Sequence, residues 1–180
     1  MQEAEADAGM IELSGFSIDR FEFPNIEGAL PTVEVTWDEA QELCRSRDKR
    51  LCSEREWEIA CRGPENFRYG DGNEYEPRRC NVPFLHEGRW IRSGPAASGL
   101  HPECASTRGV HDMIGNVWEW TDGWYDADRR WRVVRGGSWF NSLNFARVGG
   151  RYGLRLTPDY RLDLIGFRCC RSAPASSEGR

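Results

Sequence analysis

The residues best suited to chemistry lie at 109–121, which read GVHDMIGNVWEWT. Gly115 and Asn116 form a turn pair that tolerates positive φ, and the alternation after them places two indoles on one face and Glu119 on the other. A buried carboxylate beside Asn116 and free loop carbonyls could hold calcium, which binds about six to eight oxygen ligands. The alternative is that Asn116 and Glu119 only satisfy loop amides.

A second segment, RVVRGGSW at 132–139, contains a candidate nucleophile, Ser138. The available general bases are His86, His101 and His111, which stand in separate contexts, so none completes a catalytic relay. Paired glycines after a strand permit a bulge or a close approach of the backbone. We therefore interpret Ser138 as a helix cap or turn residue.

The chain contains seven cysteines, many for a cytosolic protein. No CxxC pair is present, so the spacing does not indicate a zinc or redox motif. Two interpretations stay open, namely two or three disulfides in an oxidising compartment, or buried free thiols. Cys80 and Cys104 are the first candidate pair, and the odd count leaves at least one thiol over. The cysteine content favours a cell-surface or exported protein.

Two capping boxes predict two short helices. Residues 36–39 read TWDE and open a helix to about Arg47, and residues 53–56 read SERE and open a helix that ends near Arg62. A Gly-Pro pair follows the second helix and stops it.

Short strands are predicted at 133–135 and 165–169, with a third at 34–36. Residues 64–109 have no sustained helical or strand period, and their scattered aromatic side chains predict a long but ordered loop. Together these elements predict an α+β protein.

Composition limits both the number of domains and the function. The 180 residues fit one domain, which we place at 11–171 between flexible ends at 1–10 and 172–180. The formal net charge of −5 gives no field that attracts phosphate backbones, so no nucleic-acid partner is expected. No run approaches the ~20 apolar residues of a membrane-spanning helix, and the acidic start lacks the features of a secretory signal.

Several sequence blocks, taken in order, resemble the sulfatase-modifying-factor superfamily, which includes the formylglycine-generating enzymes. The blocks are TWDEA at 36–40, KRLCSEREWE at 49–58, CRG at 61–63, YGD at 69–71, GVHDMIGNVWEW at 109–120, RGGSW at 135–139 and GFR at 166–168. The resemblance covers roughly the whole expected domain. It implies a C-type-lectin-like fold with two short helices, short antiparallel strands and much irregular loop.

The catalytic residues of the formylglycine-generating enzymes have no counterpart here. Those enzymes carry two cysteines shortly after RGGS that bind copper, whereas this sequence has Asn141 at the first position and Phe145 or Ala146 at the second. Copper(I) needs such sulfur ligands. The resemblance therefore implies no oxidase activity, and we expect no required cofactor. The structural calcium considered above for Asn116 and Glu119 is the one optional ion. The iron site of the related sulfoxide synthases needs an additional domain, for which this chain has no room.

Residues 140–164 differ in composition from the rest of the chain. They include no Glu, Lys, Gln, Met or Trp, and codons of the form NNC can encode every residue type present. Placed after RGGSW, this segment resembles the variable region of the target proteins of diversity-generating retroelements. In those proteins, adenine-directed mutagenesis varies exposed positions on a C-type-lectin fold.

The same segment has no helical or strand period, which independently predicts an exposed cluster of Phe, Tyr and Leu suited to binding. The expected ligand-binding residues are Phe140, Asn141, Ser142, Leu143, Asn144, Phe145, Tyr152, Leu154, Arg155, Leu156, Tyr160, Leu162, Asp163 and Leu164. The resemblance implies that a partly overlapping set of positions varies between copies. These positions are Phe140, Ser142, Leu143, Phe145, Tyr152, Gly153, Leu154, Leu156, Tyr160, Leu162 and Leu164. The alternative is that Phe140, Leu143 and Phe145 are core and that the composition follows from a high-GC gene.

We therefore expect a non-catalytic binding protein whose ligand, itself expected to be a protein, docks on residues 140–164. One alternative is an enzyme that uses another site, with Cys169 or Cys170 as the candidate nucleophile. The other is an accessory domain of a signalling protein, whose surface would lack a coherent apolar patch.

Overall fold

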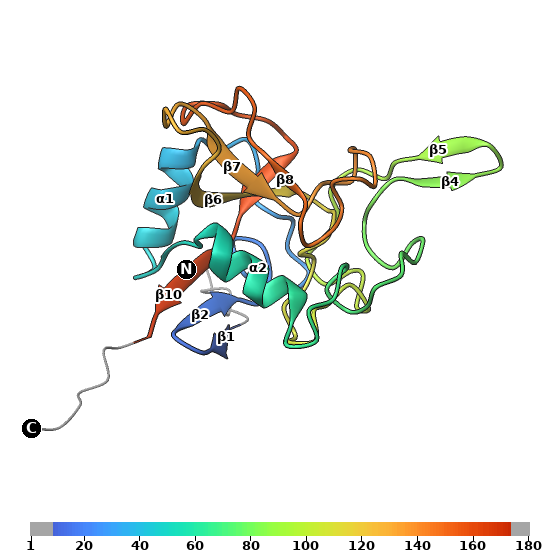
Figure 1. Cartoon of the computed structure of the whole chain (residues 1–180), viewed down its shortest axis with the longest axis horizontal. Helices are drawn as coiled ribbons and strands as arrows, with labels where there is room; N and C mark the ends of the chain where they lie inside the picture. The colour runs from blue at the N-terminus through green and yellow to red at the C-terminus, as the bar shows by residue number, and fades with distance from the viewer. Residues whose placement is uncertain (1–8, 174–180) are drawn as a thin grey trace, which may run out of the picture.

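The computed structural model describes residues 9–173. Two four-stranded sheets and two short helices form the body, and a two-stranded hairpin projects from it (Figure 1). No helix in this part of the chain combines the length and the apolar character needed to cross a membrane.

The first sheet joins the beginning and the end of the described chain. Its strand order is β1 (Met10–Leu13), β2 (Phe16–Asp19), β10 (Cys169–Ser172) and β3 (Arg50–Leu51), and all of its pairs are antiparallel. The predicted flexible ends reach too far, because Met10 and Ser172 belong to strands of this sheet. Residues 1–8 and 174–180, which make up the rest of those ends, lie outside the described residues.

The second sheet carries the candidate binding segment. Its strand order is β8 (Arg151–Tyr152), β7 (Arg132–Arg135), β6 (Trp118–Trp124) and β9 (Ile165–Phe167). The β6–β9 pair is parallel, unlike the antiparallel pairs that were expected. This pairing brings the GFR motif beside the WEW motif.

Two strand predictions need correction. The predicted strand at 165–169 is divided at Arg168, so β9 lies in the second sheet and β10 in the first. The predicted strand at 34–36 does not form, because Glu34 has a φ of 57°, in the left-handed region. Residues 133–135 lie within β7 as predicted.

Both capping boxes are present at the predicted positions. Thr36 caps α1 (Trp37–Arg45) and Ser53 caps α2 (Glu54–Arg62), each with reciprocal hydrogen bonds to the glutamate three residues later. Each helix buries one stripe of side chains. The stripe of α1 packs into the hydrophobic cluster that includes Trp118 and Trp120, and the stripe of α2 packs into a second cluster.

The hairpin lies inside the segment that was predicted to be loop. It consists of β4 (Phe84–His86) and β5 (Arg89–Ile91), joined by Glu87 and Gly88. Both turn residues have positive φ, 48° and 75°, which is the conformation of a two-residue type I′ turn. Buried aromatic side chains were expected to hold this segment in an ordered conformation, but Trp90 is 52% exposed.

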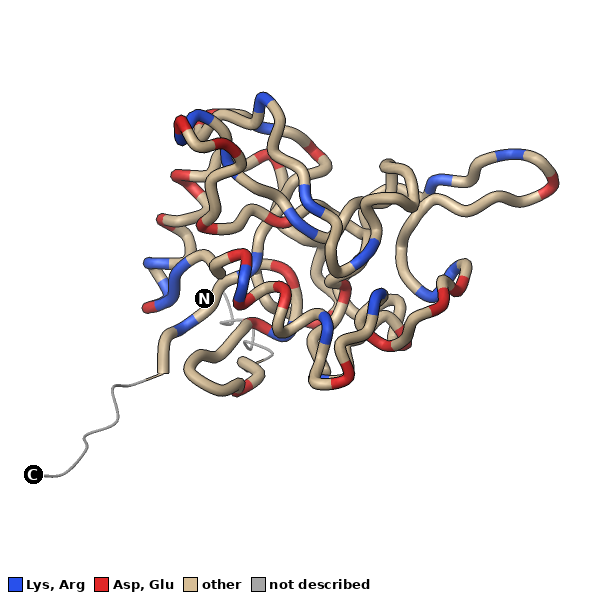
Figure 2. Tube along the Cα trace, in the orientation of Figure 1, with Lys and Arg blue, Asp and Glu red and all other residues tan. Residues whose placement is uncertain are grey.

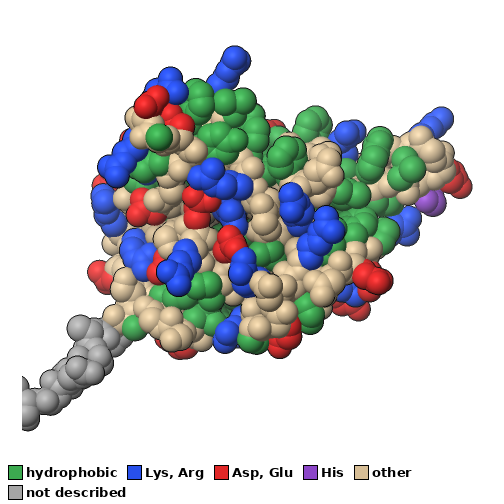
Figure 3. Space-filling model, viewed as in Figure 1, with side chains coloured by type: hydrophobic (Ala, Val, Ile, Leu, Met, Phe, Trp, Pro, Cys, Tyr) green, Lys and Arg blue, Asp and Glu red, His purple; other side chains and the backbone are tan. Residues whose placement is uncertain are grey.

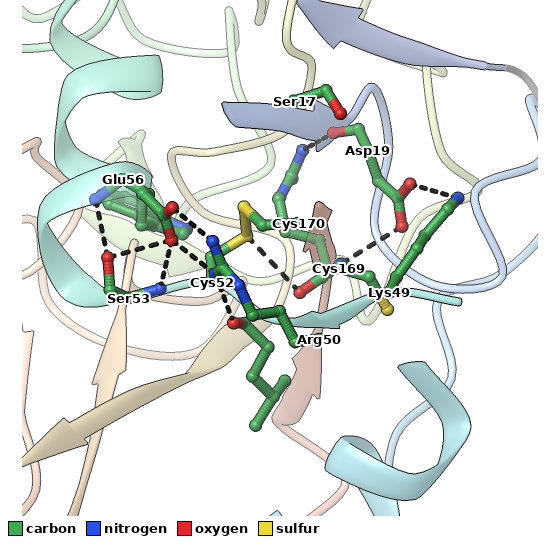
Figure 4. The surroundings of a disulfide bond; sticks show 12 residues. Ser17, Asp19, Lys49, Arg50, Cys52, Ser53, Glu56, Cys169 and Cys170 are labelled. Atoms are coloured by element: carbon green, nitrogen blue, oxygen red, sulfur yellow. Dashed lines mark hydrogen bonds and ion pairs between the residues drawn. A yellow bond between two sulfur atoms is a disulfide. The ribbon is translucent and has the colours of Figure 1, made fainter. Parts of the chain in front are cut away.

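Three disulfides crosslink the described chain. They join Cys44 to Cys169, Cys52 to Cys170, and the expected pair Cys80 to Cys104. Figure 4 shows the Cys52–Cys170 bond between two ion pairs, Arg50 with Glu56 and Lys49 with Asp19. Such bonds form and persist in oxidising compartments.

Basic and acidic residues are interspersed along most of the described chain (Figure 2). In the view of Figure 3, exposed hydrophobic side chains gather at two places, over the projecting hairpin and over the upper part of the body.

Candidate binding face

A groove of about 520 Å³ opens over the second sheet. Each strand contributes one floor residue, namely Trp118, Val134, Tyr152 and Ile165. Nine of the fourteen predicted ligand residues line the groove: Asn141, Phe145, Tyr152, Leu154, Arg155, Leu156, Tyr160, Leu162 and Leu164. The floor residues Trp118, Val134 and Ile165 were not predicted, because their strands were interpreted only as framework.

Three aromatic rings give the groove a firm floor. Trp118 lies 5.6 Å from Phe145 and 6.1 Å from Tyr152 between ring centroids, and Phe145 lies 6.0 Å from Tyr152. Such tilted and edge-on pairs are favourable geometries for aromatic side chains. Phe145 and Tyr152 are partly buried against the core, so their rings are fixed in place before any ligand arrives.

Asn141 is held at one end of the groove by two hydrogen bonds. Its Oδ1 atom accepts from the indole Nε1 of Trp118 at 2.6 Å and from the hydroxyl of Ser138 at 2.5 Å. Ser138 is fully buried. It therefore orients Asn141, as expected for a turn residue.

A smaller hollow of about 200 Å³ adjoins the groove. Phe140, Asn141 and Ser142 line it together with Trp90 and Arg92 from the hairpin side. Asn141 lines both hollows, which share no other lining residue. Phe140 is 48% exposed and is therefore not the core residue of the alternative interpretation.

The remaining predicted ligand residues lie outside both hollows. Asn144 and Asp163 are exposed, and Leu143 packs against the second hydrophobic cluster, which contains the buried stripe of α2. For Leu143 the core interpretation is therefore the better description.

Behind the groove, one buried arginine faces three buried carboxylates. Arg168 donates to both oxygens of Glu119 at 2.7 Å, and Glu22 and Asp112 complete the cluster. Burial raises the pKa of Glu22 well above its usual range, and the neighbouring Asp112 adds to this shift. Burial also raises the pKa of Asp112, to about 6. This cluster was not predicted, because its members are far apart in the chain and no local sequence pattern links them.

The contacts of Asn116 and Glu119 do not fit a calcium ion. Both oxygens of Glu119 are engaged by Arg168, and one of them also accepts from Trp57. The Oδ1 atom of Asn116 accepts from the amide of Ala96 and from a neighbouring side chain. In the described part of the chain, no group of three or more His, Cys, Asp or Glu side chains is placed so that it could hold a metal ion. The two residues satisfy loop and core groups, which was the alternative interpretation.

The sequence of this chain is similar to one protein family and to several known proteins. Residues 4–173 match the sulfatase-modifying factor enzyme 1-like domain. The chain belongs to this family. An inactive C-alpha-formylglycine-generating enzyme 2 from Bos taurus is 40% identical over 157 residues, which cover 79% of this chain and 50% of that protein. A formylglycine-generating enzyme from Thermomonospora curvata is 33% identical over 171 residues, covering 77% of this chain and 54% of that protein.

The fold of this sulfatase-modifying-factor relative is also that of a solved variable protein. Treponema denticola variable protein 1 superposes with a TM-score of 0.70 at 16% identity, covering 95% of this chain and 94% of that one. At this identity the likeness concerns the fold alone, and it agrees with the expected C-type-lectin-like class. The chain spans about half the length of the curated relatives it matches.

The alternative of a catalytic Cys169 or Cys170 in this family member is wrong. Both sulfurs are bound in disulfides and both residues are fully buried, so neither is a free thiolate nucleophile. Cys61 is the free cysteine of the described chain. It is buried, and burial raises the pKa of its thiol, which keeps it protonated and unreactive.

Two positions that were expected to vary are constrained by packing. Leu156 is only 5% exposed. A Cβ atom at Gly153 would lie 2.5 Å from the carbonyl oxygen of Arg132 and 2.6 Å from Cβ of Tyr125. Gly153 therefore belongs to the framework of the groove.

We predict that Gly153→Ala destabilises the protein by about 1–3 kcal/mol, because the blocking atom is backbone and cannot move aside. Leu154→Ala is the matched control, since Leu154 is 45% exposed, and its expected effect is within about 0.5 kcal/mol. Thermal melting of both variants measures the difference. Equal melting temperatures would show that position 153 has room for a side chain.

We also predict that lowering the pH from 7 to 5 stabilises the wild-type chain relative to Asp112→Asn, by an amount on the order of 1 kcal/mol. The pKa of Asp112, about 6, lies above the value of an unfolded aspartate. The folded state therefore takes up the proton first, and the resulting stabilisation is lost again as the pH rises through 6. The amide of Gly99 donates to the Oδ2 atom of Asp112 at 2.8 Å. The asparagine of the variant keeps a side-chain oxygen that can accept this hydrogen bond.

Urea unfolding of both proteins at the two pH values measures this difference. The pKa of His111 is lowered by burial, which opposes the trend, but this residue is present in both proteins and cancels. Glu22 is also present in both, but its raised pKa depends in part on Asp112, so the comparison measures the coupled pair. The same pH dependence in both proteins would exclude Asp112 as its source.

Proposed function

We propose that this family member is a non-catalytic binding protein whose ligand docks in the groove over the second sheet. The observation that carries the proposal is the chemistry of the groove lining. Asn141, and either Phe145 or Ala146, stand where the catalytic relatives are expected to carry reactive sulfurs, and Trp118 contacts the side chains of Asn141 and Phe145. Among the described lining residues, Arg155 is the only one charged at neutral pH. No general base or thiolate faces the groove.

The lining also defines what the ligand should offer. Leu154, Leu162 and Leu164 provide apolar walls around the aromatic floor, and Arg155 and Tyr160 provide polar groups at the rim. An apolar or aromatic side chain on a protein surface, with a hydrogen-bond acceptor nearby, matches this arrangement. The three disulfides favour an exported or cell-surface protein as the setting for such binding.

We further propose that the varied surface is smaller than the whole segment 140–164. Phe140, Leu154 and Tyr160 are 48%, 45% and 38% exposed, and Ser142 and Arg155 are exposed as well. These positions can change without disturbing the core. Phe145, Gly153 and Leu156 are packed and would stay constant.

Sequencing of sibling gene copies tests the proposed variation. Differences should concentrate at the exposed rim positions 140, 142, 154, 155 and 160, and should spare the packed positions. Identical copies, or differences spread evenly over the chain, would contradict the proposal.

Oxygen consumption tests the absence of catalysis. The copper-loaded chain with a cysteine-containing sulfatase peptide should consume oxygen no faster than a mixture without protein. The Thermomonospora curvata enzyme under the same conditions is the positive control. Copper-dependent uptake by this chain would overturn the non-catalytic assignment.

A further inference from the structure

The β4–β5 hairpin is an arm that no other strand of the described chain covers. It forms a sheet of its own and points away from the body (Figure 1). An isolated two-stranded hairpin is at best marginally stable in water. Both outer edges of the arm also keep backbone groups free to pair with another strand.

The arm exposes apolar side chains on both of its faces. Leu85 pairs across the hairpin with Trp90, and these residues are 60% and 52% exposed. On the opposite face Phe84 pairs with Ile91, which is 38% exposed. Figure 3 shows the hydrophobic side chains gathered along the arm. Apolar pairs that contribute so little to the core are typical of a binding surface.

The base of the arm is fixed to the framework. The side chain of Asn81 donates to the carbonyl of Gly94 at 2.9 Å and accepts from the hydroxyl of Ser93 at 2.6 Å, which ties the two ends of the arm together. The carbonyl of Asn81 accepts from the amide of Asn116, and Cys80 is disulfide-bonded. These contacts fix the orientation of the arm relative to the body. Binding therefore loses less conformational entropy than it would with a mobile arm.

The charges on the arm are mainly basic, although the chain has a formal net charge of −5. Arg78 stacks over Phe84 at 4.7 Å and Arg92 over Phe140 at 5.0 Å, while Arg89 is exposed on β5. Glu87 at the turn is the acidic residue between 84 and 92. Pairing the β5 edges of two copies in the register that sets Arg89 opposite Arg92 would bring arginine to arginine, which is repulsive. An acidic partner is complementary.

We propose that the arm docks an extended acidic segment of a partner protein, which adds a strand to the free edge of β5. Trp90 and Arg92, at the root of this strand, line the hollow of about 200 Å³, which would accept one apolar side chain of that segment. Backbone pairing supplies affinity in this mode, and the pocket and the arginines supply specificity. This site stands independently of the groove proposed above.

Fluorescence anisotropy with two labelled peptides tests the proposal on the whole chain. In one peptide glutamate alternates with leucine, and in the other lysine replaces glutamate. The acidic peptide should bind and the basic peptide should not. Trp90→Ala should weaken binding about tenfold or more, and the double variant Arg89→Glu, Arg92→Glu should reverse the preference between the peptides.

Two matched controls separate the arm from other surfaces. Leu100→Ala removes a leucine that is 66% exposed elsewhere, and Tyr160→Ala alters only the groove. Neither should change the affinity for the acidic peptide, and all variants should keep the wild-type melting temperature.

Several peptide and vesicle results would overturn the proposal. They are failure of the acidic peptide to bind, equal binding of both peptides, a loss of affinity in Tyr160→Ala, and binding to phosphatidylserine vesicles that Trp90→Ala abolishes. Only the third of these bears on the groove, so the two proposals fail separately. Dimerisation that Trp90→Ala abolishes would assign the arm to a second copy instead, and would overturn it as well.

Discussion

Replacing Arg168 by methionine is expected to destabilise the protein by about 3–5 kcal/mol. The guanidinium is fully buried and donates to both oxygens of Glu119, as well as to the carbonyls of Asp19, Arg20 and His111. Methionine can fill most of the volume, but it leaves the Glu119 carboxylate buried without a cation and removes one donor from each of three carbonyls, of which that of Arg20 still accepts from the amide of His111. Urea unfolding measures the cost, which approaches the whole stability of a small domain.

Two further variants show whether the lost charge is the cause. Arg171→Met makes the same change at an exposed site in β10 and should cost less than about 0.5 kcal/mol. Adding Glu119→Gln to Arg168→Met should restore part of the lost stability, because it removes the unpaired charge and keeps an acceptor for Trp57. If the second change instead adds further loss, the destabilisation comes from packing and not from charge.

The helices were predictable because their signals are local. Each capping box lies within four consecutive residues, and the helix starts at Trp37 and Glu54 follow directly from it. The family motifs were equally readable, since the order of the blocks requires no three-dimensional information.

The split strand and the charged cluster could not be predicted from local patterns. Residues 165–169 have strand-like composition throughout, and only the pairing of Ile165 with Trp118 and of Cys169 with Leu51 assigns its two halves to different sheets. Arg168, between them, is the residue that links the sheets to Glu119. A missed signal was available for the hairpin, where Glu87-Gly88 separates two short apolar runs.

The candidate site was predictable as a segment but not residue by residue. The composition of 140–164 pointed to the groove walls, and nine of the fourteen named residues line it. The segment has no period, so the sequence alone could not distinguish the exposed Leu154 from the buried Leu156. The space at Gly153 depends on the backbone of β7, which is distant in sequence.

Removing both disulfides of β10 is expected to cost more than twice what either removal costs alone. The Cys44–Cys169 and Cys52–Cys170 bonds close loops of almost the same length, with separations of 125 and 118 residues. While one bond is present, the other closes only a further ring of roughly ten residues, so its loss costs about 2.5–3 kcal/mol. Losing both frees the long loop as well, and the total rises to about 7–8 kcal/mol.

Alanine pairs at each bond, singly and together, measure this by urea unfolding under oxidising conditions. Cys61→Ala controls for the loss of a buried sulfur without a crosslink. The Cys80–Cys104 bond spans 24 residues and should cost about 3.5 kcal/mol, whether or not a β10 bond is present. If the costs of removing the two β10 disulfides simply add, the bonds stabilise the fold through local contacts. Non-additive costs would show that the crosslinks act on the unfolded chain, with either one sufficient to hold β10 between β2 and β3.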